Sequence, residues 1–126
     1  MLSDAPLMAF IPVTDPAAAR RFYETTLGLD VVEESTNAVV VDAMGTMLRL
    51  TPVGDLLVQP FTIAGWQVRD IGRVVDGLSA LGVAFTRYEG MEQDDRGIWT
   101  TPGGDRVAWF TDPDGNTLSL TSFAAG

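Results

Sequence analysis

The chain has 126 residues, enough for one compact domain with its own hydrophobic core and too few for two independent domains. It contains no cysteine and no histidine, which excludes disulfides, thiolate metal sites and imidazole as a ligand or base. Its 17 acidic and 8 basic residues give a formal charge of −9, which would repel nucleic acid and anionic membranes. We interpret the acidity as a source of solubility and expect no nucleic-acid partner.

The sequence has no apolar run near the roughly 18 residues that a membrane-spanning helix requires. Its first six residues contain neither a basic stretch nor an apolar core, so we expect no secretory signal. These features favour a cytoplasmic protein without membrane association.

The first half of the chain predicts a strand, a helix and three further strands. An apolar strand is expected over residues 7–13, and Asp15 followed by Pro16 is a strong signal for the start of a helix. Gly28 is expected to end that helix in the left-handed conformation. Strands over residues 29–33, 38–42 and 46–51 complete a βαβββ module of residues 7–51.

The second half repeats this order after a linker over residues 52–60. A strand over residues 61–68 precedes a helix that Asp70 caps and Gly82 ends, and three strand candidates follow up to residue 121. Matching short motifs in the two halves lie 54 to 55 residues apart at the helices and 70 apart at the last strands. The difference locates an insertion of about fifteen residues between Tyr88 and Arg106.

Residues 112–120 read Asp-Pro-Asp-Gly-Asn-Thr-Leu-Ser-Leu, which predicts a β-hairpin. This hairpin, the repeat, the Ile-x-Val-x-Asp start and the Leu-Gly-Leu helix end together resemble the vicinal oxygen chelate superfamily, which includes glyoxalases, bleomycin-resistance proteins and dioxygenases. The resemblance extends over nearly the whole chain. It implies an α+β fold of residues 1–126 as a single domain, in which the sheets of two tandem βαβββ modules form a shared cleft, and it implies a homodimer.

In metal-dependent members of that superfamily, four ligands come from the first and last strands of the two modules. The resemblance assigns these positions to Met8, Arg49, Ile63 and Ser119. None is a usual ligand for a hard or borderline cation, and a guanidinium would repel the ion. We therefore predict that the protein has no metal centre of the family type and needs no cofactor.

Alternation along the strands places a mixed apolar and polar set of side chains on the faces opposite the helices. Because polar groups such as Gln67 are costly to bury without partners, this composition favours a pocket for a small-molecule ligand over a plain core. The aromatic residues of the insertion and of the final hairpin add flat surfaces. The predicted cleft comprises Met8, Phe10, Met47, Arg49, Ile63, Gln67, Trp99, Trp109, Ser119 and Thr121.

Two residues of this set have open alternatives. Arg49 can bind an anionic group of a ligand, or it can pair with Glu33 or Asp42 of its own chain. Trp99 ends the insertion over residues 89–99, which can either complete the cleft or form a solvated loop with Trp99 in the core or at a dimer interface.

Three functions fit the sequence. The first is a protein similar to bleomycin-resistance proteins that binds or sequesters a small organic molecule in a metal-free cleft. The second is an enzyme of the superfamily, a lyase, isomerase, hydrolase or dioxygenase-like protein with an atypical or absent metal centre. It would use Tyr88, Glu92, Asp94 or Asp95 as proton carriers and Arg49 to stabilise an anion. The third is an interaction module with a vestigial cleft.

Overall fold

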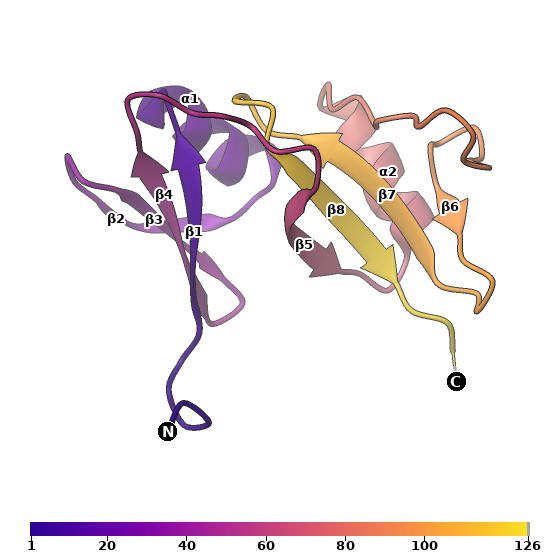
Figure 1. The fold of residues 1–126 in the computed structure, drawn as a ribbon, viewed down its shortest axis with the longest axis horizontal. Coiled ribbons are helices and arrows are strands. Elements are labelled where there is room, and N and C mark those ends of the chain that lie inside the picture. The colour runs from indigo at the N-terminus through magenta and orange to yellow at the C-terminus, as the bar shows by residue number, and fades with distance from the viewer. Residues whose placement is uncertain (126) are drawn as a thin grey trace. The chain divides into compact units, whose positions relative to one another are not determined.

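The computed structural model describes residues 1–125, and the chain divides into two compact units between Val58 and Gln59. This division falls inside the predicted linker. Each unit contains one four-stranded mixed sheet and one helical segment (Figure 1). The fold is therefore α+β and built from two sheet modules, as the sequence predicts.

The first unit follows the predicted βαβββ order. Its sheet has the strand order β1-β4-β3-β2, in which β1 and β4 are parallel and the other pairs are antiparallel. The elements are β1 (Met8–Val13), α1 (Pro16–Arg20), η1 (Arg21–Thr26), β2 (Asp30–Glu34), β3 (Val39–Ala43) and β4 (Thr46–Pro52).

The second unit has the same topology, with the strand order β5-β8-β7-β6 and a parallel pair formed by its first and last strands. The repeat inferred from the sequence is thus a repeat of structure. Its elements are β5 (Thr62–Gln67), α2 (Ile71–Ala80), β6 (Trp99–Thr100), β7 (Arg106–Thr111) and β8 (Thr117–Ser122).

Both helical segments begin at the predicted aspartates and end at the predicted glycines. The Asp15 carboxylate accepts hydrogen bonds from the amides of Ala17 and Ala18, and the Asp70 carboxylate accepts one from the amide of Arg73. Gly28 and Gly82, at φ 77° and 94°, supply the left-handed ends.

The first helical segment differs from the single α-helix expected between Asp15 and Gly28. From Arg21 onward its turns are wider, and the Leu27 amide donates to the Phe22 carbonyl, five residues earlier, at 2.9 Å. Apolar spacing predicts a helix, but it does not distinguish an α-helix, whose amides bond to the fourth preceding carbonyl, from a π-helix, whose amides bond to the fifth. The segment buries Tyr23 completely.

Alternate residues of a strand point to opposite sides of its sheet, and in β4, β7 and β8 buried side chains alternate with partly exposed ones. In β3, three consecutive valines are buried. In the second unit, α2 packs against β7 and β8 (Figure 1). Phe85 also lies against Phe110, with ring centroids 5.6 Å apart. The buried apolar residues of this unit are Ile71, Val75, Ile98, Ala108, Phe110, Leu118 and Leu120.

The predicted hairpin joins β7 to β8 and is held together by the buried pair Asp112 and Asn116. The Asp112 carboxylate accepts hydrogen bonds from the amides of Asp114 and Asn116 and from the Asn116 side chain, at 2.9 to 3.0 Å. Gly115 turns the chain at φ 88°. The hairpin fixes the register that places Trp109 beside Ser119.

None of the helices within residues 1–125 has the length and apolar character needed to cross a bilayer.

Candidate functional site

The insertion in the second unit is an ordered loop held by local hydrogen bonds. Gly90 and Gly97 reverse the chain at φ 81° and 85°. Between them, the Asp94 carboxylate accepts hydrogen bonds from the amides of Arg96 and Ile98, each at 2.9 Å. Ile98 is buried and anchors the end of the loop. The next residue, Trp99, begins β6 and is thereby fixed beside β7.

Gln93 connects the two ends of the insertion. Its side-chain nitrogen donates to the carbonyls of Thr86 and Gly97 at 2.9 and 2.8 Å. Its side-chain oxygen accepts from the main-chain amide of Tyr88 at 2.7 Å. The Thr86 amide in turn donates to the Trp109 carbonyl at 2.7 Å. These bonds hold the segment that carries Tyr88 against β7.

Three aromatic side chains meet as a result. The rings of Trp99 and Trp109 are stacked at a centroid distance of 6.3 Å and an angle of 29°, and Tyr88 meets Trp109 edge-on at 5.3 Å. We call Tyr88, Trp99 and Trp109 the aromatic cluster. All three rings keep part of their surface exposed, so the cluster is available to a ligand.

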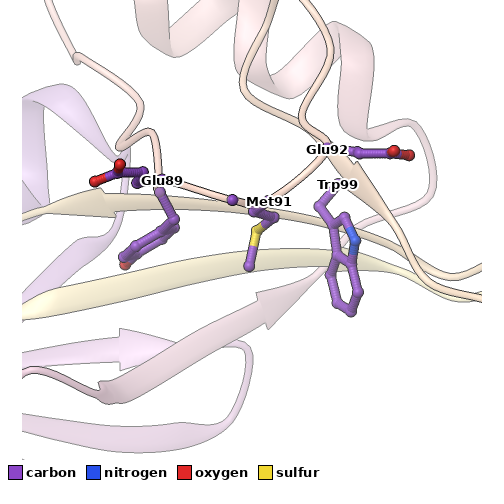
Figure 2. Close-up of a pocket in the computed structure, with 6 residues that line it drawn as sticks. Glu89, Met91, Glu92 and Trp99 are labelled. Atoms are coloured by element: carbon purple, nitrogen blue, oxygen red, sulfur yellow. The ribbon is translucent and has the colours of Figure 1, made fainter.

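Two cavities open beside the aromatic cluster. The larger, of about 560 Å³, is lined by Tyr88, Glu89, Gly90, Met91, Glu92 and Trp99 (Figure 2). The smaller, of about 290 Å³, is lined by Pro60, Phe61, Thr62, Tyr88, Met91, Trp109 and Thr117. Because both are lined by Tyr88 and Met91, we treat them as one site of two compartments. Their volumes suit a small organic molecule.

Figure 2 shows how the loop presents its side chains. Met91 and Trp99 extend in the same direction from the backbone, whereas Glu89 and Glu92 extend to opposite sides. Both glutamates are exposed, and neither forms a hydrogen bond or ion pair within the part of the chain that the structure describes. The apolar floor of the site therefore has two available carboxylates at its margin.

The structure brings some of the predicted second-unit residues together. Trp99 lines the larger compartment and Trp109 the smaller. Ser119 lies next to Trp109 on β8, and on its other side its hydroxyl lies over Gly65, where an added Cβ would come within 2.4 Å of it. Ile63, Gln67 and Thr121 are on β5 and β8 and line neither of these two compartments.

The predicted first-unit residues are neighbours on β1 and β4. Met8 pairs with Met47, and Phe10 pairs with Arg49. Met8, Phe10 and Met47 are exposed to 43%, 62% and 40%, so the apolar side chains on this face are largely unburied. That this face and the second unit's sheet form a shared cleft stays a prediction.

In the described part of the chain, Arg49 does not form the ion pair with Glu33 or Asp42 that the sequence left open as an alternative. Within residues 1–125 no ion pair joins it to Glu33 or Asp42, and the Asp42 carboxylate instead accepts the Gly45 amide at 3.0 Å in the turn before β4. In this turn Met44 and Gly45 both have positive φ, 49° and 92°, as a tight hairpin turn requires. Arg49 therefore keeps an available guanidinium.

The side chains at the four family ligand positions do not fit a metal ion. Met8 and Ile63 have no oxygen or nitrogen donor, Arg49 is a cation, and Ser119 offers one hydroxyl that lies over Gly65. Among the described residues, no three His, Cys, Asp or Glu side chains are grouped so as to hold a metal ion.

Several contributors to the site, Glu89 among them, escaped the sequence interpretation. Phe61 was placed only within a strand, Met91 only within the insertion, and Gln93 had no assigned role. The composition of the insertion, with two glycines around an amphipathic run, was the available signal. It could not indicate which side chains turn toward β7.

Comparisons with known proteins agree with this architecture. The family model described as Glyoxalase/Bleomycin resistance protein/Dioxygenase superfamily matches residues 6–120. A solved structure of a member of that superfamily from Sphaerobacter thermophilus is 25% identical, with a TM-score of 0.74 over 98% of this chain and 100% of its own. No curated protein matches the chain.

Two further solved structures show the likeness of fold at lower identity. Lactoylglutathione lyase from Agrobacterium tumefaciens is 18% identical, with a TM-score of 0.75 over 94% of this chain and 93% of its own. A glyoxalase/bleomycin resistance protein/dioxygenase from Alicyclobacillus acidocaldarius is 17% identical, with a TM-score of 0.73 over 97% and 93%.

Proposed function

The chain belongs to the Glyoxalase/Bleomycin resistance protein/Dioxygenase superfamily, and within it we propose that this protein binds a small organic molecule at the aromatic cluster without a metal ion. The observation that carries the proposal is the coincidence of the stacked Trp99 and Trp109 rings with the two compartments that share Tyr88 and Met91. Partly exposed aromatic rings around an apolar hollow offer both area and stacking geometry to a flat ligand.

Binding suits these residues better than catalysis does. Of the proton carriers considered, Tyr88 and Glu92 line the site, whereas Asp94 is engaged in the turn of the insertion. Within residues 1–125, no hydrogen bond joins the Tyr88 hydroxyl to Glu89 or Glu92. A general acid or base acts on a proton of the substrate, and no pairing within the site singles out these groups for that role. A superfamily enzyme with an atypical or absent metal centre remains the alternative.

The first test is a thermal-shift screen of small aromatic compounds against the metal-free protein, because a ligand that prefers the folded state raises Tm. A compound that raises Tm is then titrated while tryptophan fluorescence is followed. We expect Trp99→Ala to weaken its binding by at least about tenfold, since the variant loses the stacked ring and its apolar area.

Phe123→Ala is the matched control, because Phe123 is a 59% exposed aromatic residue of the same unit that lines neither compartment. It should bind the compound as the parent protein does. Equal affinities in Trp99→Ala and the parent would place the ligand elsewhere and contradict the proposal, and turnover of the compound would favour the enzyme.

A further inference from the structure

The groups that line the site carry charge of one sign only. Glu89 and Glu92 border the larger compartment, and no lysine or arginine lines either compartment. The remaining polar side-chain groups of the lining are uncharged: the hydroxyls of Thr62, Tyr88 and Thr117 and the indole N–H groups of the two tryptophans. An anionic ligand would meet two carboxylates and no cation, so the lining disfavours it.

The arginines within and beside the insertion each have another partner. Arg96 forms a two-pronged ion pair with Asp76, at 2.8 and 2.9 Å. Arg106 lies 3.7 Å from the Asp94 carboxylate, and Arg87 donates to the Gln93 carbonyl at 3.3 Å. Glu89 and Glu92 have no such partner among the described residues. The two carboxylates are therefore available to interact with a ligand in the larger compartment.

The aromatic cluster favours the same sign of ligand. The face of an indole or phenol ring carries negative potential and attracts a cation within about 6 Å of its centre. The Trp99 and Trp109 rings are tilted by only 29°, so their faces are nearly parallel. A flat ring that bears positive charge can thus stack on indole while its charge approaches a glutamate.

We propose that the ligand of this site is a flat organic cation, an aromatic ring that carries a quaternary, amidine or protonated amine nitrogen. This inference rests on the proposed function and narrows it to a chemical class. The protein's formal charge of −9 adds a long-range attraction for such a ligand, and the local arrangement of rings and carboxylates provides the selectivity.

The experiment compares three probes of similar shape by calorimetry at pH 8 and low salt: 1-methylquinolinium, neutral quinoline and naphthalene-2-carboxylate. We expect 1-methylquinolinium to bind at least about tenfold more tightly than quinoline, and the carboxylate to bind most weakly. The double variant Glu89→Gln/Glu92→Gln should weaken 1-methylquinolinium about fivefold or more and change quinoline less than about twofold.

The matched control is Glu33→Gln/Asp55→Asn, which removes two exposed charges of the first unit and changes the net charge equally. This control variant should still bind the cation more tightly than the neutral and anionic probes. If it loses that preference, the selectivity does not come from Glu89 and Glu92. If quinoline or naphthalene-2-carboxylate binds as tightly as 1-methylquinolinium, and Trp99→Ala still weakens that binding, the inference of a cationic ligand is wrong. The proposed function is then unaffected. Failure of all three probes to bind would contradict both.

Discussion

At the scale of single residues, Gln93 links three main-chain groups beside the site. Its side-chain amide makes three hydrogen bonds to main-chain groups, at Thr86, Tyr88 and Gly97. Each bond satisfies a backbone group of the loop, which would otherwise need water or another partner. The position of Tyr88 in the aromatic cluster therefore depends on a residue that does not line either compartment.

We expect Gln93→Glu to lower the free energy of unfolding by about 2 kcal/mol, because a carboxylate would face the two carbonyl oxygens that now accept hydrogen bonds. Urea denaturation measures the change, and near-ultraviolet circular dichroism should report a disturbed aromatic cluster. Gln67→Glu, at an exposed residue of β5, is the control and should change stability by less than about 0.5 kcal/mol. Equal stability of the two variants would show that the three bonds do not support the loop.

At the scale of elements, the insertion is fastened to α2 by the ion pair of Arg96 with Asp76. This hydrogen-bonded pairing is the main reason that the pKa of Asp76 lies below its ordinary value of 3.8 and that the pKa of Arg96 is raised. The aspartate loses its proton more readily in the folded protein than in the unfolded chain. The pair therefore stabilises the fold above about pH 4, and its contribution is lost as the pH falls through the lowered pKa.

Arg96→Met should return the pKa of Asp76 toward 3.8, as followed by carboxyl carbon resonances in an NMR titration. Arg69→Met is the control, because it removes an arginine of the same unit that does not pair with Asp76. An Asp76 pKa that stays low in Arg96→Met would contradict the assignment of the pair. Because Arg96 lies three residues before Trp99, the variant should also broaden the Trp99 side-chain resonance.

At the scale of the whole molecule, each of the two units provides two of the four strand positions to which the family resemblance assigns metal ligands. The residues present, Met8, Arg49, Ile63 and Ser119, do not fit an ion. We therefore expect protein purified without chelators to contain far less than one equivalent of divalent metal, and Tm to be unchanged by a chelator or by added Mn²⁺, Zn²⁺ or Ni²⁺.

Elemental analysis measures the metal content, and a thermal-shift assay measures Tm. Substituting Arg49→Met tests whether the guanidinium alone prevents metal binding, and we expect no gain because the other three positions still lack suitable donors. A near-stoichiometric ion that raises Tm would contradict the metal-free proposal. The homodimer implied by the family resemblance stays a prediction, which sedimentation of the full chain would test.

The sequence by itself determined the modules, because their signals are local. An aspartate cap, a glycine at a helix end and alternating apolar residues each act within a few positions, and their recurrence in both halves identified the repeat. The same locality accounts for the error at residues 21–26, where apolar spacing alone cannot show that the helix widens.

Only the tertiary structure decided which side chains form the site. Trp99 and Trp109 were predicted for the cleft, but their stacking depends on the pairing of β6 with β7, and Tyr88 joins them through the bond from Thr86 to Trp109. These contacts follow no periodic pattern, and the bond from Thr86 to Trp109 joins residues far apart in the sequence. The physical reason is that an irregular loop takes its shape from specific side-chain hydrogen bonds, such as those that Gln93 makes to residues four to seven positions away, which no backbone propensity records.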